Sequence, residues 1–424
     1  MALIIQKYGG TSVGSTKRIK HVAARIAQFK KQGHQVVVVV SAMSGQTDKL
    51  LSLAKEIQDP PNPRELDVVL STGEQVTIGL LSLALTKLGI AAKSYTGWQI
   101  PLYTDPIYSK ARIQTIEPIR IQQDLGRGLV AVVAGFQGID SDRNITTLGR
   151  GGSDISAVAL AACLKADECQ IYTDVNGVYT TDPRVVPQAR KLDKITFEEM
   201  LELASLGSKV LQIRSVEFAG KYRVPLRVLS SLKEENDGGT LISLEGESDM
   251  EMEVVTGIAF DRNQARIHIQ GIPNRPGVAY HIMKYVASNN INVDMIVQNI
   301  AENGTTDFSF TIPRDDYAQI FELLKASVLE LQAKKIGGND KVAKVSLVGL
   351  GMRSHVRVAA KVFKILANEN IDLIMISTSE IKVSILVDEK YVELATRALH
   401  EGFELDKEPC DRRYTDVQIM FWLN

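Results

Sequence analysis

Four segments of the chain combine residue types that bind phosphate and carboxylate groups. They are KYGGTSVGS (7–15), SAMSGQTD (41–48), TTLGRGGSDISAVALA (146–161) and IYTDVNGVYTTDPR (171–184). Glycines let backbone N–H groups approach an anion, a helix N-terminus adds a favourable dipole, lysine supplies a compact cation, and arginine can grip a carboxylate with two hydrogen bonds. The four segments together indicate a site for anionic small molecules.

Each segment also has an ordinary structural interpretation. A Gly-Gly pair before a helix is often a plain turn, Ser44, Thr47 or Asp154 suits a helix cap, and Asp-Pro and Asn-Gly are turn formers. The first segment lacks the GxxxxGK[ST] spacing of a Walker loop. GRGG lacks the third glycine and the downstream acid of a dinucleotide fingerprint. No single segment therefore decides the function.

Apolar runs place these segments beside buried strands. Five valines at 36–40 are too β-branched and continuous for a surface helix, and they predict a strand buried on both faces. Further strands are predicted at 2–7, 129–134, 169–173 and 225–229. One helix is predicted over 67–88. A second is predicted before Gly33, because Ile19, Val22, Ala23 and Ile26 share one helical face and Gly33 is a stop signal. This alternation predicts an α/β sandwich around a mostly parallel sheet, which binds ligands at the carboxyl ends of its strands.

The last third of the chain contains an internal repeat. Residues 266–299 align without gaps onto 344–377, with seven of 34 positions identical. Each copy is predicted to run strand, helix, strand, strand, helix, which lacks one strand of a ferredoxin-like βαββαβ unit. The strand VVTGIAF (254–260) has no place in a simple tandem and is a candidate for completing one copy. An acidic, glycine-bearing stretch at 233–253 indicates the boundary before the repeat.

Composition excludes several other classes of protein. The chain has 424 residues, 45% of them hydrophobic, and a formal net charge of -1, which argues against a broad basic surface for nucleic acid. Three scattered cysteines form no CxxC pair and are too few for a disulfide framework. No secretory signal and no run of about 18 apolar residues is evident. We therefore expect a cytoplasmic protein of two or three domains, without a membrane segment or a protein-ligated metal site.

The order and wording of the motifs resemble the aspartate kinases of the amino-acid kinase superfamily over essentially the whole chain. Besides the four segments, STGEQ (71–75) and LGSKVLQIRSVEFA (206–219) carry this resemblance, although alanine is expected before the lysine of LGSK. VDMIVQN (293–299), SLVGLGMRSH (346–355) and ISTSEI (376–381) are similar to the paired ACT domains of that family. The resemblance implies a three-layer α/β/α kinase domain at 1–245, followed by ferredoxin-like ACT modules at 262–338 and 342–424.

The resemblance also implies a reaction and residues that carry it out. The family transfers the γ-phosphoryl group of ATP to the side-chain carboxylate of L-aspartate, giving 4-phospho-L-aspartate, the first step towards lysine, threonine and methionine. The acceptor is already ionised at pH 7, so catalysis needs positioning and charge neutralisation rather than a general base. Mg²⁺ is expected with ATP, held largely by phosphates and water.

Matching positions give the expected site. The catalytic residues are Lys7, Asp154 and Lys209, with Asp154 orienting the lysines. The nucleotide contacts are Lys7, Gly9, Gly10, Thr173, Asp174, Tyr179, Arg184 and Lys209. The aspartate contacts are Ser41, Thr47, Glu74, Arg150 and Ser153, with Arg150 on a carboxylate and Glu74 on the amino group.

The ACT pair implies regulation by end products, namely lysine, threonine or both. Effector contacts are expected at Gly277, Ala279, Gln298 and Asn299, whereas Asn292 and Asp294 can equally be plain turn and edge-strand residues. The second copy lacks the Pro-Gly turn of the first and carries Arg357 near a helix N-terminus, so we expect it to bind no effector in its own loop. The implied assembly is a homodimer through the ACT modules, or a chain with a separate regulatory subunit.

Two other functions compete with this interpretation. One is another amino-acid kinase acting on a carboxylate, a carbamate or a nucleotide, which would lack the GRGGSD wording or the ACT pair. The other is a non-catalytic amino-acid sensor that uses only the repeat. The presence of Lys7, Arg150, Asp154 and Lys209 argues against a loss of activity.

Overall fold

The computed structural model describes residues 1–206, 210–233, 238–244, 255–289, 291–300, 304–349, 352 and 356–408. Lys209, Cys410 and most of the turn before the second-copy helix lie outside these residues. The chain divides into two compact units, which are described separately. The first comprises Met1–Tyr179, Lys191–Ser205 and the described residues of 210–244; the second comprises Thr180–Arg190, residue 206 and 255–408.

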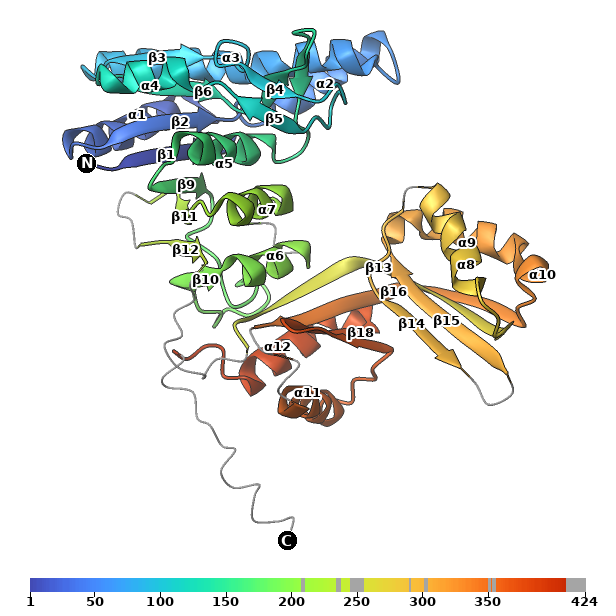
Figure 1. The fold of residues 1–424 in the computed structure, drawn as a ribbon. Helices are drawn as coiled ribbons and strands as arrows, with labels where there is room; N and C mark the ends of the chain where they lie inside the picture. The colour runs from blue at the N-terminus through green and yellow to red at the C-terminus, as the bar shows by residue number, and fades with distance from the viewer. Residues whose placement is uncertain are drawn as a thin grey trace. The chain divides into compact units, whose positions relative to one another are not determined.

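The first unit is built on an eight-stranded sheet that is parallel except for one strand pair (Figure 1). In sheet order its strands are β10 (Lys194–Thr196), β12 (Thr240–Ser243), β11 (Leu226–Ser230), β9 (Glu168–Thr173), β1 (Leu3–Tyr8), β2 (Gln35–Val40), β6 (Val130–Ala134) and β3 (Ala92–Tyr95). The strands predicted at 2–7, 36–40, 129–134, 169–173 and 225–229 are confirmed to within one residue at each end. The five valines of β2 are fully buried, as a central strand requires.

Helices cover both faces of this sheet, so the predicted three-layer sandwich is confirmed. The helices are α1 (Thr16–Lys31), α2 (Gln46–Ile57), α3 (Pro63–Lys87), α4 (Ile119–Gly126), α5 (Gly152–Leu164), α6 (Phe197–Ser205) and α7 (Ile213–Tyr222). Helices α1 and α3 bury their apolar sides against the central valines on one face. Helix α5 packs on β1, β2 and β9 from the other face, next to α7. Helix α5 is almost entirely apolar and buried, which suits a helix enclosed by sheet and neighbours.

A small antiparallel-rich sheet lies beside this core. Its strands, in order, are β5 (Ile113–Ile116), β4 (Leu102–Thr104), β7 (Gln137–Ile139) and β8 (Ile145–Thr147). Strand β7 follows β6 almost directly, and β8 leads into α5. This sheet therefore sets where the Gly-Arg-Gly-Gly segment begins.

Helix α3 is long and apolar enough to cross a membrane, although the sequence predicted no such segment. It carries two buried carboxylic acids, Asp67 and Glu74, and packs against α1, α2 and the sheet. These features identify a core helix of a folded domain.

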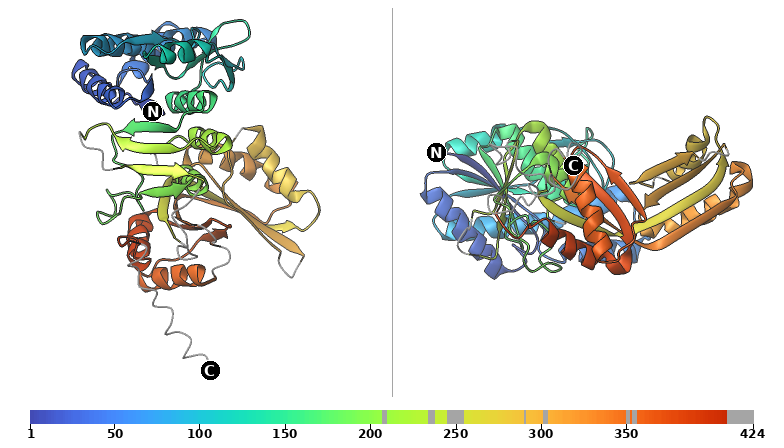
Figure 2. Two further views of the ribbon diagram at one scale, coloured as in Figure 1. Left: turned by 60° about the vertical axis from the view of Figure 1, so that its left-hand side comes forward. Right: turned by 90° about the horizontal axis from the view of Figure 1, so that it is seen from below.

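The second unit is built on a six-stranded antiparallel sheet (Figures 1 and 2). In sheet order its strands are β14 (Ile296–Ile300), β15 (Thr305–Ile312), β13 (Gly257–Pro273), β16 (Lys335–Val348), β18 (Lys382–Asp388) and β17 (Met375–Thr378). Its helices are α8 (Val278–Ser288), α9 (Arg314–Ala326), α10 (Val328–Leu331), α11 (Val356–Asn368), η2 (Glu389–Tyr391) and α12 (Val392–Gly402). Helices α8 and α9 enclose one apolar core, and α11 and α12 enclose a second.

Each half of this sheet is a ferredoxin-like module, because the two long central strands serve both halves. The start of β13, from Gly257 to Asp261, pairs with Lys344–Val348 of β16. The start of β16 pairs in turn with residues 266–270 of β13. The sequence left open which copy the strand at 254–260 completes. In the structure it supplies the fourth strand of the second one, where Val255 and Ile258 join the apolar core.

The segment Thr180–Arg190 interrupts the sequence of the first unit but packs with the second unit. The Thr180 carbonyl accepts a 2.6 Å hydrogen bond from the Ile258 backbone, and the Thr180 hydroxyl lies 2.9 Å from Nε2 of His400. Both side chains of the latter pair are buried. The TTDPR motif is thereby attached to the second unit through its first residue, Thr180.

Candidate active site

The predicted ligand-binding edge exists at the carboxyl ends of four neighbouring strands. Strands β9, β1, β2 and β6 are parallel, and their ends carry Thr173, Lys7, Ser41 and Gly135. The registers of these pairs set Lys7 opposite Val39 on one side and Ile171 on the other. Three of the four motif segments begin at this edge, as binding between strand ends requires.

Lys7 and Asp154 form the central ion pair of the site. Lys7 Nζ lies 2.6 Å from Asp154 Oδ1, and the two side chains are 11% and 13% exposed. Asp154 stands in the first turn of α5, but Gly151 is the residue that precedes this helix as its cap. The interpretation of Asp154 as a helix cap is therefore wrong, and its carboxylate instead holds the lysine.

The two glycines after Lys7 form a turn rather than the start of a helix. The Ser12 and Val13 backbones donate to the Gly9 carbonyl, and α1 begins only at Thr16, where the Ser15 hydroxyl caps it. The segment 7–15 therefore runs from the end of β1 to the start of α1, as predicted, and its glycines form the turn between them. A side chain on Gly10 would place Cβ 3.0 Å from the Ala42 carbonyl oxygen, so the turn packs tightly on the segment after β2.

Glu74 reaches the same edge from α3. The Ala42 backbone donates a 2.9 Å hydrogen bond to its Oε1, while its Oε2 has no hydrogen-bond partner within the described part of the chain. Gly73 allows this approach, since a Cβ there would lie 2.8 Å from Ala42 Cβ. Burial raises the pKa of Glu74 to about 7. A buried carboxyl with one open oxygen is suited to receiving a cation.

The other residues expected near aspartate differ in their exposure. Ser41 is half-buried and its N–H donates to the Tyr8 carbonyl, whereas Thr47 is exposed in the first turn of α2. Neither Ser44 nor Thr47 caps α2, because Gly45 occupies that position without a side-chain bond.

The Arg150 loop is held by residues that sequence analysis missed. Gln212 Nε2 donates to the Arg150 carbonyl at 3.1 Å, and Arg214 Nη1 donates to the Leu148 carbonyl at 2.8 Å. Arg150 itself is exposed, whereas Ser153 is buried against Gly135. The sequence offered one signal, because Gln212 and Arg214 stand in the matching segment 206–219.

An aromatic layer under the site was also missed. Tyr8 and Tyr172 stack with ring centroids 4.6 Å apart, and the Arg25 guanidinium lies 4.9 Å from the Tyr172 centroid. Arg25 also donates to the Ser230 carbonyl at 3.2 Å. This layer joins the ends of β1, β9 and β11 through the residues next to Lys7 and Thr173 in their strands.

The expected nucleotide residues are divided between the two units. Thr173 ends β9 in the first unit, and Asp174 and Tyr179 follow it; the Thr173 carbonyl accepts from the Ser231 backbone. Arg184 belongs to the second unit, and its guanidinium grips Asp182 with bonds of 2.7–3.1 Å. This contact holds the pKa of Asp182 below its ordinary value. Lys209 lies outside the described residues.

The expected effector residues all belong to the first ACT module. Gly277 caps α8 with a φ of 93°, Ala279 is in the first turn of that helix, and Gln298 and Asn299 are exposed on the edge strand β14. Asp294 forms an ion pair with the buried Lys344 of β16. Asp294 therefore has a structural role.

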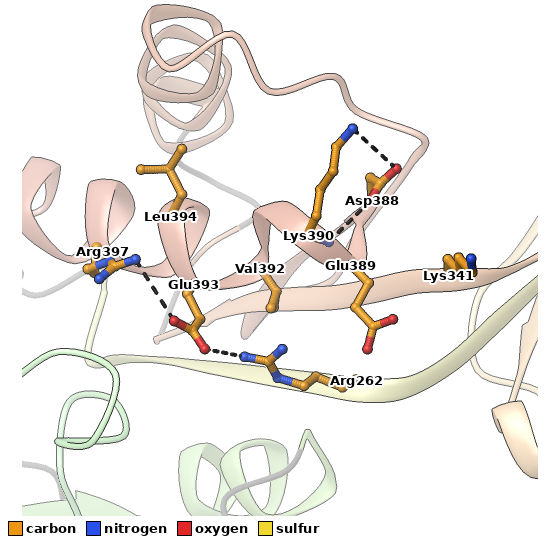
Figure 3. Close-up of a pocket in the computed structure, with 9 residues that line it drawn as sticks. All are labelled: Arg262, Lys341, Asp388, Glu389, Lys390, Val392, Glu393, Leu394 and Arg397. Atoms are coloured by element: carbon orange, nitrogen blue, oxygen red, sulfur yellow. Dashed lines mark hydrogen bonds and ion pairs between the residues drawn. The ribbon is translucent and has the colours of Figure 1, made fainter.

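The second unit also has a surface cavity of about 670 Å³, drawn in Figure 3, which contains none of these effector residues. It is lined by Arg262, Lys341, Asp388, Glu389, Lys390, Val392, Glu393, Leu394 and Arg397. Its charges pair largely with each other: Glu393 bonds Arg262 at 2.6 Å and lies 3.9 Å from Arg397. It is a solvated ion-pair surface and gives no reason to revise the effector positions.

Comparison with known proteins agrees with this architecture. The model of the amino acid kinase family matches residues 2–230, and that of an ACT domain matches residues 267–327 and 345–403. The aspartokinase of Pseudomonas aeruginosa is 60% identical over 407 residues, covering 96% of this chain and 98% of that protein.

Two solved structures of Escherichia coli aspartokinase III match nearly the whole chain. The complex with aspartate and ADP has a TM-score of 0.77 at 25% identity, covering 95% of this chain and 100% of that one. The complex with lysine and aspartate has a TM-score of 0.75 at 25% identity, covering 94% and 99%. With a kinase sandwich, two ACT modules and relatives of this similarity over its full length, the chain belongs to the aspartate kinases, phosphotransferases that use a carboxyl group as acceptor.

Proposed function

We propose that the edge formed by β9, β1, β2 and β6 binds ATP and L-aspartate and transfers the γ-phosphoryl group to the aspartate side chain. The observation that carries this assignment is the pairing of Lys7 with Asp154 beside the glycine turn. Lys7 neutralises charge on the transferring phosphoryl group, and Asp154 keeps its ammonium in place. Gly9 and Gly10 offer backbone N–H groups to the phosphates.

The aspartate substrate is held by groups of opposite charge. Arg150 binds a carboxylate of the substrate, Glu74 receives its ammonium group, and Ser41, Thr47 and Ser153 complete the contacts. The nucleotide is bound by Thr173, Asp174, Tyr179, Arg184 and Lys209. Crystals of E. coli aspartokinase III with aspartate and ADP support ATP as the donor.

Mg²⁺ accompanies ATP and is held mainly by phosphate oxygens and water. Across the described ranges, no three His, Cys, Asp or Glu side chains are grouped so as to bind a metal ion. A Mg²⁺ ion that keeps most of its waters and binds through substrate phosphates needs no such group. The ion supplies charge neutralisation when bound, and the protein's part is to position the two substrates.

We expect the purified enzyme to form an acyl phosphate from aspartate and ATP. Trapping with hydroxylamine gives aspartyl hydroxamate, and omission of ATP or aspartate gives none. The same assay with added lysine, threonine or both identifies the effector, and glutamate serves as the matched control acceptor. Activity with glutamate or a nucleotide but not with aspartate would overturn the assignment.

The ACT modules bind an end-product amino acid, lysine, threonine or both together, which lowers kinase activity. E. coli aspartokinase III has been crystallised with lysine, which supports an amino-acid effector. The cap of α8 at Gly277 offers N–H groups for the effector carboxylate, with Ala279, Gln298 and Asn299 as further contacts. The second module binds none in its own loop, where Arg357 stands in the first turn of α11.

Substitution of Gly277 tests the effector site. Its φ of 93° disfavours any side chain, although the space around it is open, so Gly277→Ala shifts the backbone of the cap. We expect the effector concentration for half-inhibition to rise about tenfold, as for a loss of about 1.4 kcal/mol of binding. Gly33→Ala is the control, since Gly33 has a φ of 86° and open space after α1. Equal inhibition curves for the two variants would refute the assignment.

The chain forms a homodimer through its ACT modules. Strand β14 ends the six-stranded sheet, and Ile296 and Ile300 on it are 54% and 67% exposed. An exposed apolar edge strand favours pairing with a second copy around a two-fold axis. Pairing with a separate regulatory subunit would use the same edge. As a biosynthetic enzyme with the unpaired thiols Cys163 and Cys169, the protein works in the cytoplasm.

A further inference from the structure

Asp67 is a fully buried carboxylic acid in the second turn of α3 that takes no part in the contacts proposed above. Its Oδ2 accepts hydrogen bonds from the backbones of Ser109 at 2.9 Å and Thr147 at 2.8 Å. Its Oδ1 accepts from the hydroxyls of the same two residues, at 3.0 and 2.8 Å. Four donors from two separate chain segments therefore converge on one side chain.

Both segments lead to the Arg150 loop. Thr147 is the last residue of β8, three positions before Arg150. Ser109 lies against the loop from the other side, since a Cβ on Gly149 would be 2.9 Å from the Ser109 carbonyl oxygen. Ser109 has a φ of 64°, an unusual conformation for a residue with a side chain. The bonds that Asp67 accepts from Ser109 maintain that conformation, and with those from Thr147 they fix the start of the loop on two sides.

The helix that carries Asp67 also carries Glu74. The two residues are seven positions apart, which places them on the same face of α3 about 10 Å along its axis. Between them, the Ser71 carbonyl accepts a 3.0 Å hydrogen bond from Gln137 Nε2, so the same face is tied to β7 as well. One rigid helix therefore sets the position of Glu74 and, through Asp67, that of the Arg150 loop.

We propose that Asp67 is a positioning residue of the aspartate pocket, which fixes the loop of Arg150 relative to Glu74. This inference rests on the proposed function, in which Arg150 and Glu74 hold opposite ends of the substrate. Aspartate is small, and the distance between its ammonium and carboxylate groups is nearly fixed. A change of about 1 Å in the distance between Arg150 and Glu74 therefore weakens binding and slows the reaction strongly. Asp67 acts through hydrogen-bond geometry and not through its charge.

That distinction gives a conservative variant. In Asp67→Asn the amide oxygen can accept both backbone N–H groups, and the amide NH₂ can donate to both hydroxyls, which rotate to accept. The loop keeps its anchor although the charge is gone. Asp67→Ala removes all four bonds and leaves the N–H groups of Ser109 and Thr147 without a partner.

Asp140 supplies a closely matched control. It is 2% exposed, and one oxygen accepts from the backbones of Asp142 and Asn144 at 3.0 and 2.8 Å. Its other oxygen accepts from Tyr108 Oη at 3.1 Å and Asn144 Nδ2 at 3.0 Å. Asp140 stands in the β7–β8 turn, at the opposite end of β8 from Arg150. Asp140→Ala therefore costs the domain a similar set of bonds, of which three come from the β7–β8 turn itself and none from Ser109 or Thr147.

The test measures KM for aspartate, KM for ATP and kcat by hydroxamate trapping in the full-length chain. We expect Asp67→Ala to raise KM for aspartate by about ten- to a hundredfold and KM for ATP by less than threefold. Asp67→Asn stays within about threefold of the parent in all three constants. Asp140→Ala lowers thermal stability as Asp67→Ala does but leaves the ratio of the two KM values unchanged.

Three results would overturn the proposal: an unchanged KM for aspartate in Asp67→Ala, an equal loss in Asp140→Ala, or a loss in Asp67→Asn as large as in Asp67→Ala. If Asp67→Ala does not fold, Thr147→Val replaces it, because it removes one of the four bonds and keeps the strand; a KM for aspartate raised about threefold supports the proposal and an unchanged one refutes it. Arg150→Met distinguishes a failure of the proposed function of the Arg150 loop from a failure of the proposed role of Asp67. If Arg150→Met leaves KM for aspartate unchanged, the proposed function of the loop fails; if it raises that KM and Asp67→Ala does not, only the role of Asp67 fails.

Discussion

Replacing Lys7 with methionine is expected to lower kcat by about a hundredfold to a thousandfold with little change in the fold. A single preorganised donor to the charge that develops in a transition state accounts for an effect of that size. Lys7 is suited to this role because its side chain is only 11% exposed at the end of a central strand and its ammonium group lies 2.6 Å from Asp154. Methionine keeps most of the length of the unbranched side chain and removes its charge, so we expect the packing of β1 to be preserved.

The ion pair makes this prediction sharper. In Lys7→Met the Asp154 carboxylate loses its partner and adds a negative charge near the phosphates. We therefore expect the double variant Lys7→Met/Asp154→Asn to turn over at least as fast as Lys7→Met alone. The single variant Asp154→Asn loses less, since the lysine remains. This non-additive pattern distinguishes a shared role in catalysis from two separate defects.

Single-turnover and steady-state rates with saturating ATP and aspartate measure these effects. Lys20→Met is the control, because Lys20 is exposed on α1 and lies outside the four motif segments. Matching thermal unfolding curves for the variants exclude a loss of folding. If Lys7→Met keeps kcat within about threefold of the parent, the assignment of the phosphoryl site is wrong.

Local patterns in the sequence predicted the elements well, because they depend on residues that are neighbours in the chain. The valine run at 36–40 became β2, and the apolar face of Ile19 and Val22 became the buried side of α1. The predicted start of α3 was late by four residues. The signal was present, since Asn62 caps the helix and Pro63 takes its first position.

Long-range pairing was less predictable. The repeat showed two similar modules, but the sequence does not state which strand completes which module. The answer depends on β13 and β16 being long enough to cross both halves of one sheet. The first residues of β13 therefore belong to the second module, and the first residues of β16 belong to the first module. No local sequence pattern indicates this exchange.

The site shows the same limit. Motif residues such as Lys7 and Glu74 could be singled out because their neighbours are distinctive, although the alternative of a helix cap at Asp154 was wrong. Asp67, Arg25 and Gln212 were missed because each acts on chain segments far away in sequence. Asp67 alone contacts segments 42 and 80 positions distant. A polar residue in an apolar helix is the only local trace of such a role.

The pH dependence of aspartate use is expected to follow Glu74. Burial raises its pKa to about 7, so at pH 6 most of the free enzyme carries a neutral carboxyl that binds the substrate ammonium poorly. Because kcat/KM reports the free enzyme, kcat/KM for aspartate falls about tenfold per pH unit below pH 7. At pH 8 Glu74→Gln lowers kcat/KM for aspartate about a hundredfold, since a desolvated ion pair is lost.

The comparison between variants isolates this group. The phosphates of ATP also gain a proton near pH 6, but they do so equally with every enzyme. The pH profile of Glu74→Gln therefore keeps the contribution of ATP and loses the steeper slope for aspartate. Glu65→Gln is the matched control, because Glu65 stands on the same helix and its side chain is 64% exposed. An unchanged slope in Glu74→Gln would show that another group binds the ammonium.

The stability of the free enzyme is expected to change with pH in the opposite direction to its activity, falling as the pH rises. Below pH 4.5 Glu74 is protonated in both the folded and the unfolded chain, so it contributes no pH dependence there. Between pH 4.5 and 7 the unfolded chain loses this proton first, and the folded state loses stability as the pH rises. Above pH 7 the penalty is constant, at most about 3 kcal/mol.

Glu74→Gln should therefore unfold at a higher temperature than the parent at pH 8 and at the same temperature near pH 4.5, and Glu65→Gln should show no such crossover. Bound aspartate is expected to narrow the difference at pH 8, because its ammonium compensates the buried carboxylate of the parent but not the amide. A variant that loses both activity and stability at pH 8 would point to a merely structural Glu74. The carboxylate of Glu74 lies in the apolar environment of α3 and lowers the stability of the free enzyme. It becomes favourable only when the ammonium group of the aspartate substrate binds beside it.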